Sequence, residues 1–171
     1  MNKIDTSEWK EYKIEDIFSL DKPNPRSKND YDEGAIPFVA SGNFNNGIEC
    51  YLSIKNSTDF DAGNCLTVSP VDGSTFYQEK DFLGRGGAGS SILILRNDKL
   101  NKFNGLFLAS IIRKVCSKYS YNNMGNQKKL KEEIIYLPVK NDEPDWKYME
   151  DFIKRLIEDK KKDFVNLMKI I

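Results

Sequence analysis

Short apolar segments alternate with turn residues from Ile36 to Leu95, and this spacing constrains the fold more than any other feature of the sequence. The segments are AIPFVA, IECYLSI, CLTVSP, TFYQ and SILIL, and they are separated by SGNFNNG, VDGS and a glycine-rich loop. Strand-length apolar runs between turn residues are typical of a compact, mostly-β unit. Asn46-Gly47 is the strongest turn signal among them. We therefore expect several short strands joined by hairpin-like connections.

The hydrophobic period changes after this region. Four apolar residues fall at the i, i+3, i+4, i+7 spacing of one helix face that ends near Cys116: Leu108, Ile111, Ile112 and Val115. A core position is expected for that face. The run EEIIYLPV predicts a strand ending at Pro138, and the stretch from Trp9 to Leu20 predicts an opening strand followed by a helical turn. The expected fold class is α+β, with a mostly-β domain and a few short helices in residues 1–140.

Residues 141–171 are expected to form a C-terminal helix. Pro144 suits the first helical turn, where its missing N–H costs nothing, and Asp145 suits the positive end of the helix dipole. A continuous helix from Asp145 to Ile171 would be about 40 Å long. Its first apolar stripe, from Met149 to Ile157, is expected to dock on the domain, whereas the second stripe either packs or pairs with a partner helix. The candidate oligomerisation residues are Phe152, Leu156, Phe164, Leu167 and Ile171.

The loop FLGRGGAGSS carries the G-x-G-x-x-G spacing of a dinucleotide-binding turn in Gly84, Gly86 and Gly89. That fingerprint requires a helix after the glycines, so that the pyrophosphate lies at the helix N-terminus. Here the apolar run Ser91 to Leu95 follows and predicts a strand. We therefore expect no nucleotide cofactor, and instead a flexible loop between two strands with Arg85 at its tip.

Composition excludes several kinds of catalytic site. The 171 residues include no histidine, which removes the commonest general base and metal ligand. Cys50, Cys65 and Cys116 are too widely spaced for a C-x-x-C zinc motif, so no metal site is expected and the thiols are expected to be reduced. The paired carboxylates lie in polar runs typical of solvated surfaces. The sequence has no membrane span or signal peptide and predicts a cytoplasmic protein.

A basic segment stands out although 26 basic and 26 acidic residues cancel over the whole chain. From Arg113 to Lys131 there are six Lys and Arg residues and no Asp or Glu, interleaved with tyrosines, asparagines and a glutamine. Such side chains can contact phosphates, stack on bases or hydrogen-bond to base edges. A solvated basic face is the alternative interpretation of the same pattern.

Several stretches resemble one known family. GNCLTVSP followed by TFYQEKDF, then NKFNGLFLASIIRK, and then IIYLPVKNDEPDWKYMEDFIKRL are similar to the target recognition domain of restriction-modification specificity subunits, of the type I and type IIB kinds. The similarity runs in order from Trp9 to Leu156. Its most specific part is LPV followed by PDWKYMEDFI, Leu137 to Ile153.

The resemblance implies that the chain reads double-stranded DNA and is not itself an enzyme. Partner subunits would supply adenine methylation, with S-adenosylmethionine bound to the methyltransferase, and cleavage by a restriction subunit. The glycine loop would then place Arg85 against guanine or a phosphate, although a loop without a partner is the alternative. The candidate DNA-binding residues are Asn43, Asn45, Asn46, Ser74, Tyr77, Gln78, Lys80, Arg85, Arg113, Lys114, Lys118, Tyr119, Tyr121, Asn123, Gln127 and Lys128.

The chain departs from the family pattern in its length. A type I specificity subunit has two recognition domains and two spacer helices, and this chain has room for one of each. It resembles a half-subunit, and two copies could pair through the C-terminal helix into a homodimer. Two other functions remain open: a regulator that engages the methyltransferase without reading DNA, and a small enzyme that uses carboxylates.

Overall fold

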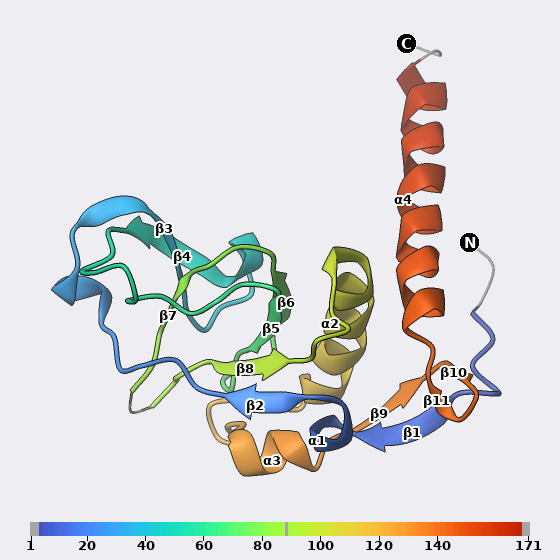
Figure 1. The fold of residues 1–171 in the computed structure, drawn as a ribbon, viewed down its shortest axis with the longest axis horizontal. Coiled ribbons are helices and arrows are strands. Elements are labelled where there is room, and N and C mark those ends of the chain that lie inside the picture. Colours follow the sequence, from blue (N-terminus) through green and yellow to red (C-terminus); the bar gives the residue numbers. More distant parts are fainter. Residues whose placement is uncertain (1–3, 88, 169–171) are drawn as a thin grey trace.

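The computed structural model of the chain describes residues 4–87 and 89–168 (Figure 1). A β-rich body lies beside one helix, and a longer helix projects away from both. The helices are α1 (Ile14–Ile17), α2 (Lys102–Cys116), α3 (Gln127–Lys131) and α4 (Trp146–Met168), with short 3-10 turns at Lys28–Asp30 and Asn45–Gly47.

A four-stranded sheet occupies the centre of the β-rich body. Its order is β2-β8-β5-β6 and its pairings are antiparallel. The strands are β2 (Ser19–Asp21), β8 (Leu93–Arg96), β5 (Cys65–Val68) and β6 (Thr75–Gln78). The pairing brings together segments that are far apart in the sequence, because β2 lies against β8 with Leu20 opposite Leu95.

A three-stranded sheet covers one side of this centre. Its order is β4-β3-β7, formed by Ile48–Leu52, Glu33–Val39 and Leu83–Gly84. The β3–β4 pair is antiparallel, whereas β7 runs parallel to β3 with Phe38 opposite Leu83. Two smaller antiparallel pairs join β1 (Lys10–Lys13) to β9 (Ile134–Leu137) and β10 (Val139–Lys140) to β11 (Glu143–Pro144).

Strand β5 is buried on both faces, as all four of its residues show. Neighbouring residues of a strand point to opposite faces of the sheet. Leu66 and Val68 belong to the cluster that contains the inward face of α2, whereas Cys65 packs with Val39 and Phe82 on the other side. The core therefore has two layers that share this strand.

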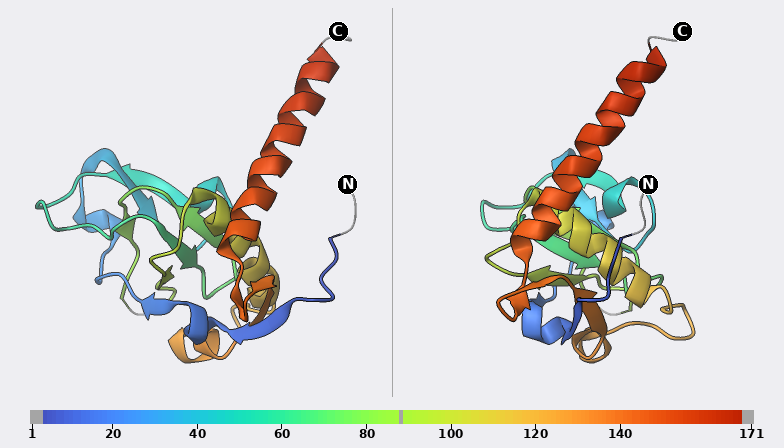
Figure 2. Two further views of the ribbon diagram at one scale, coloured as in Figure 1. Left: turned by 45° about the vertical axis from the view of Figure 1, so that its right-hand side comes forward. Right: turned by 90° about the vertical axis from the view of Figure 1, so that its right-hand side faces the viewer.

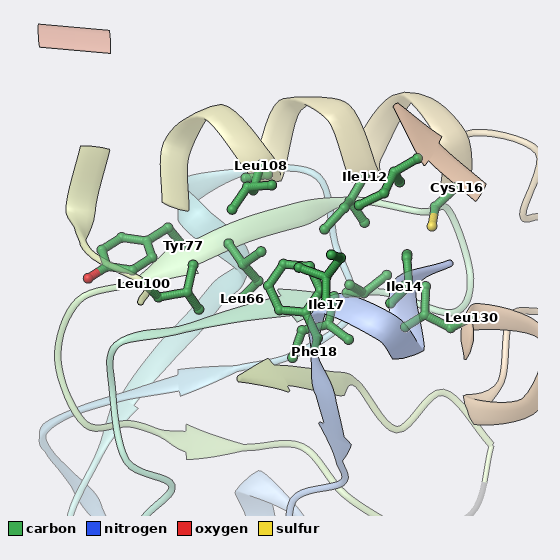
Figure 3. Packing of buried hydrophobic residues seen from close by; sticks show 14 of the residues in the cluster. Ile14, Ile17, Phe18, Leu66, Tyr77, Leu100, Leu108, Ile112, Cys116 and Leu130 are labelled. Carbon is green, nitrogen blue, oxygen red and sulfur yellow. The ribbon is translucent and has the colours of Figure 1, made fainter. Parts of the chain in front are cut away.

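Helix α2 covers the first layer (Figure 3). Its N-terminus is capped by Asn101, whose side-chain oxygen accepts from the backbone N–H groups of Phe103 and Asn104 at 2.9 and 3.1 Å. A cap of this kind satisfies donors that have no partner within the helix. Leu108 and Ile112 point into this layer, as the helical spacing predicted, and Cys116 is buried in the same cluster. Ile111 and Val115, the other two residues of the predicted face, are partly buried against it.

Helix α4 contacts the body through its first turns and then leaves it (Figure 2). The Phe152 ring meets the Phe107 ring of α2 edge to face, with centroids 5.6 Å apart, and Met149 is fully buried. Farther along, Phe164 and Leu167 are exposed. Within the described residues, no helix combines the length and apolarity that a membrane crossing requires.

A buried ion-pair cluster fixes the polar loop that precedes β3. The Arg26 side chain is almost fully buried, and its Nε and Nη1 atoms lie 3.1 and 2.6 Å from carboxylate oxygens of Asp59 and Asp61. Asp61 also accepts from the backbone N–H of Gly84 at 2.9 Å. Burial alone raises the pKa of Asp59, but hydrogen bonds from Arg26 and Tyr31 outweigh it and lower that pKa. Arg26 thereby joins three chain segments: its own loop, the 59–61 segment and β7.

The expected α+β fold is confirmed, with local corrections. Pro144 lies in β11, outside the last helix, and Asp145 accepts from the backbone N–H of Tyr148 at 2.8 Å as a cap. Helix α3 was not predicted; it begins after Asn126, whose side chain accepts from the Lys129 N–H at 2.9 Å. The predicted boundary at residue 140 falls inside the β10–β11 pair and stays a prediction.

Leu108→Ala should destabilise the domain strongly, because Leu108 is completely buried on the inward face of α2. We expect the free energy of unfolding to fall by about 2–5 kcal/mol, the usual cost of such a cavity. The matched control is Leu106→Ala in the same helix, since the Leu106 side chain is 41% exposed; it should cost less than about 1 kcal/mol. Urea unfolding followed by circular dichroism measures both, and equal losses would contradict the two-layer core.

Arg26→Met should also be costly, because it leaves the Asp59 and Asp61 carboxylates without their buried cation. Removing one partner of a buried pair destabilises by about 3–5 kcal/mol. Lys28→Met is the control: Lys28 pairs with Glu49 at the exposed surface, where a pair contributes about 0–1 kcal/mol. The same urea titration compares the two variants, and a near-neutral Arg26→Met would show that the cluster does not hold the loop.

Candidate nucleic-acid interface

The turn between β3 and β4 presents three of the predicted residues at the surface. Asn43, Asn45 and Asn46 are all exposed. Asn45 and Asn46 have φ angles of 47° and 55°, a left-handed conformation that asparagine tolerates better than most residues. The Asn46 amide donates to the Tyr77 carbonyl oxygen at 3.2 Å and to the Gln78 side-chain oxygen at 3.0 Å. These two hydrogen bonds fasten the turn to β6.

The basic end of α2 lies beside this turn. Arg113 donates a hydrogen bond to the side-chain oxygen of Asn43, and its guanidinium lies 5.5 Å from the centre of the Phe76 ring. Lys114, the next residue, is exposed. The fold therefore brings the asparagine turn and Arg113 together although 70 residues separate Asn43 from Arg113. We call Asn43, Phe44, Asn45, Asn46 and Arg113 the turn–helix surface.

Four predicted contacts lie in the interior and require correction. Their exposed fractions are all below a tenth: Ser74, Tyr77, Gln78 and Tyr119. The Tyr77 hydroxyl donates to Asn64 at 2.8 Å, and the Tyr119 hydroxyl donates to Glu133 at 3.1 Å. Burial raises the pKa of both tyrosines, so their hydroxyls stay neutral donors. These side chains are buried inside the domain and are not available to a duplex in this conformation.

Gln78 has a supporting role that the sequence did not indicate. Its amide nitrogen donates at 3.0 Å both to the Asn46 carbonyl oxygen and to the Thr67 hydroxyl. Thr67 belongs to β5, the strand that both core layers share. The Gln78 side chain therefore links the central strand to the exposed turn.

The glycine loop differs from its prediction. Arg85 is half-buried and does not lie at a loop tip: its backbone N–H donates to Val39 at 2.8 Å, and its carbonyl accepts from Ile92 at 3.1 Å. Its guanidinium donates to the Ser90 hydroxyl. A Cβ atom on Gly86 would lie 2.1 Å from the Asn24 carbonyl oxygen, so that glycine permits close packing against the chain itself. The loop leads into β8, so a strand follows the glycines, as the sequence predicted, and not the helix of a nucleotide-binding turn.

The segment after α2 forms a second basic surface. Tyr121 is 82% exposed, and Asn123 and Lys128 are also exposed. Lys118 pairs with Glu133 at 2.6 Å, and Gln127 is half-buried beside β2. Lys80 is exposed after β6. The structure thus divides the surface candidates between the turn–helix surface, this second segment, and Lys80 and Arg85.

Two of the three cysteines lie in the core. Burial raises the pKa of the Cys65 and Cys116 thiols to about 12, so both are protonated core side chains. Cys50 is half-buried, and all three thiols are free. Within residues 4–87 and 89–168, no cluster of three or more potential ligands could hold a metal ion.

One exposed residue of the turn–helix surface was missed by the sequence analysis. Phe44 lies between Asn43 and Asn45, and its side chain is 85% exposed. The available signal was its place among polar turn residues in SGNFNNG, where an apolar ring has no core to enter.

Comparison with known proteins identifies relatives of the chain. The chain is 34% identical over 152 residues to the specificity subunit S.BcgI of a type II restriction enzyme from Heyndrickxia coagulans. The matched region covers 86% of this chain and 43% of that protein. Solved structures share the fold. The HsdS subunit from Thermoanaerobacter tengcongensis superposes with a TM-score of 0.58 at 16% identity, over 90% of this chain and 38% of that one.

The S subunit of a type I restriction-modification system from M. genitalium gives a TM-score of 0.57 at 14% identity, over 96% of this chain and 44% of that one. The chain thus spans about two fifths of the length of these relatives. The family model described as the type I restriction modification DNA specificity domain matches residues 6–166. The chain therefore belongs to this family of specificity domains.

Proposed function

We propose that this chain binds double-stranded DNA at a specific sequence, as one recognition half of a restriction-modification specificity subunit. In that role it directs a partner methyltransferase, and a restriction subunit where one is present, to the target site. The family match over residues 6–166 carries the proposal. The chain spans about two fifths of the length of these relatives.

The surface chemistry supports DNA as the ligand. Lys114 and Lys128 are exposed, and neither lies within salt-bridge distance of a carboxylate among the described residues. Such lysines suit phosphate contacts, which position a protein on the duplex and make its affinity depend on salt. Amide and guanidinium groups suit base edges, and the turn–helix surface holds Asn43, Asn45 and Arg113 for this purpose.

The chain supplies recognition and its partners supply chemistry. S-adenosylmethionine would be bound by the methyltransferase subunit, and adenine methylation would take place there. One solved relative, with a TM-score of 0.62 at 19% identity over 91% of this chain and 39% of that one, is described in terms of complex assembly of a type I restriction-modification system. A corresponding assembly is part of this proposal.

A homodimer through α4 completes the proposed half-subunit. Phe152 is committed to α2 by its contact with Phe107. Farther along, Leu156, Ile157, Phe164 and Val165 line an apolar groove flanked by lysines. Two copies paired along this groove would present two recognition domains related by a twofold axis, which suits a symmetric site in two parts. Ile171 was also predicted to take part but lies outside the described residues.

Selection from a random duplex library tests the DNA-binding proposal. The purified chain should enrich one motif at near-physiological salt, because base contacts persist when phosphate contacts weaken. Lys114→Gln combined with Lys128→Gln should keep the motif, lower the affinity, and reduce the slope of log K against log salt by about 2. Lys162→Gln, an exposed lysine of α4, is the control.

In the same selection experiment, Arg85→Gln distinguishes a base contact of Arg85 from a phosphate contact. A changed preference at one motif position would identify a base contact, whereas uniform weakening would identify a phosphate contact. Retention that ignores sequence and disappears with salt would contradict sequence reading by the isolated chain and favour a regulator that engages the methyltransferase.

Phe164→Asp should dissociate the proposed dimer. Phe164 is 62% exposed on the isolated chain. A carboxylate at this position would be costly to bury against a second copy. We expect the dimer dissociation constant to rise at least about tenfold in sedimentation equilibrium. Asn166→Asp, on the same exposed part of α4, adds the same charge two residues away and should have a smaller effect. Equal effects of the two variants, or a wild-type chain that is monomeric throughout, would contradict pairing through this stripe.

A further inference from the structure

Phe44 is the most exposed large apolar side chain among the described residues, at 85%. It lies in the turn between β3 and β4, flanked by the exposed amides of Asn43 and Asn45. An aromatic ring that is exposed to water does not stabilise the folded chain, because it is neither buried nor packed against other side chains. Its position is therefore informative about what the turn contacts.

The ring is carried on a rigid support. The Gly47 backbone N–H donates to the Phe44 carbonyl oxygen at 2.8 Å, and the Gly47 carbonyl accepts from Ala40 at 2.9 Å. Two hydrogen bonds from the Asn46 amide and one from Gln78 then fasten the turn to β6. Because Gln78 is itself buried and bonded to Thr67, the backbone that carries Phe44 is anchored in the core.

The neighbours of the ring favour a nucleic acid as its partner. Arg113 is tied to Asn43, which places a guanidinium in the same turn–helix surface as Phe44. Asp72 is an acidic residue close enough to interact with the charge of Arg113. Its carboxylate already accepts a hydrogen bond from the Ser74 backbone N–H at 3.0 Å. A single apolar ring among amides and a cation matches a base stack lined by phosphates better than it matches an apolar protein groove.

We propose that Phe44 inserts between two adjacent base pairs of the bound duplex, partly unstacking them and bending the DNA at that step. Apolar wedges of this kind offset the cost of unstacking by bringing more of the duplex against the protein. Asn43 and Asn45 on either side then reach the edges of the opened base pairs, and Arg113 contacts a phosphate nearby. The inference rests on the proposed DNA-binding function and adds to it a mode of contact and a specific side chain.

Fluorescence of 2-aminopurine tests the insertion. The probe is a duplex carrying the motif enriched by the wild-type chain, with 2-aminopurine substituted at one position at a time. Loss of stacking raises its fluorescence, so binding of the wild-type chain should brighten one step only. Phe44→Ala should abolish that signal and weaken binding roughly 5- to 100-fold, the range for losing one base–aromatic contact, while preserving the enriched motif outside that step.

Two further variants make the result specific. Phe44→Leu keeps an apolar wedge and should retain most of the signal. Tyr136→Ala removes an aromatic ring that is 54% exposed on β9, in a different sheet, and should leave both signal and affinity unchanged. Circular dichroism of each variant confirms the fold.

Three outcomes would overturn the proposal. Sequence-selective binding without any bright step would overturn the insertion and leave the proposed function standing. Absence of selective binding by the wild-type chain would overturn both. A Phe44→Ala variant that binds DNA as the wild type does but loses a methyltransferase partner would assign the ring to a protein contact.

Discussion

The rest of the structure depends on the burial of β5 from both sides. Leu66 and Val68 pack under α2, and Cys65 packs against Val39 and Phe82 of the other layer. A strand buried on one face would need only one covering element. Neither face of β5 is exposed to water. Helix α2 on one side and the β4-β3-β7 sheet on the other must therefore both be in place. The two elements that carry the turn–helix surface are therefore fixed by one strand.

Polar side chains extend this constraint from the core to the surface. Gln78 is 4% exposed, and its side chain forms hydrogen bonds with Asn46 of the β3–β4 turn and with Thr67 of β5. A buried amide without partners would be costly, so its hydrogen bonds specify one arrangement of the turn. The Arg26 cluster acts in the same way on the loop before β3 and on β7. Recognition of a base sequence needs such fixed positions, because a contact displaced by an ångström no longer discriminates between bases.

Periodicity predicted the elements that bury apolar surface by themselves. The α2 face through Leu108 and Ile112, the strand in CLTV and the end of α2 near Cys116 are all confirmed. The misplaced site residues Gln78, Tyr119 and Arg85 have a common physical cause, since each is positioned by a partner that is not its neighbour in sequence. Gln78 and Tyr119 looked like surface contacts until their bonds to Asn46 and Glu133 placed them inside. The loop holding Arg85 looked mobile because sequence does not reveal its backbone bond to Val39 in β3. Base contacts remain untested predictions.

The described chain separates the two kinds of surface on which the proposed DNA binding and the proposed pairing of two copies depend. Amides, a guanidinium and one aromatic ring gather where the β3–β4 turn meets α2, on backbone tied to the core. Apolar side chains without core partners gather instead on the distal part of α4, where the helix has left the body (Figure 2). A long helix anchored only by its first turns transmits little strain to the domain at its base. In the proposed dimer, pairing of two α4 helices would set the distance between the two domains, while each turn–helix surface would keep the geometry that its own core imposes.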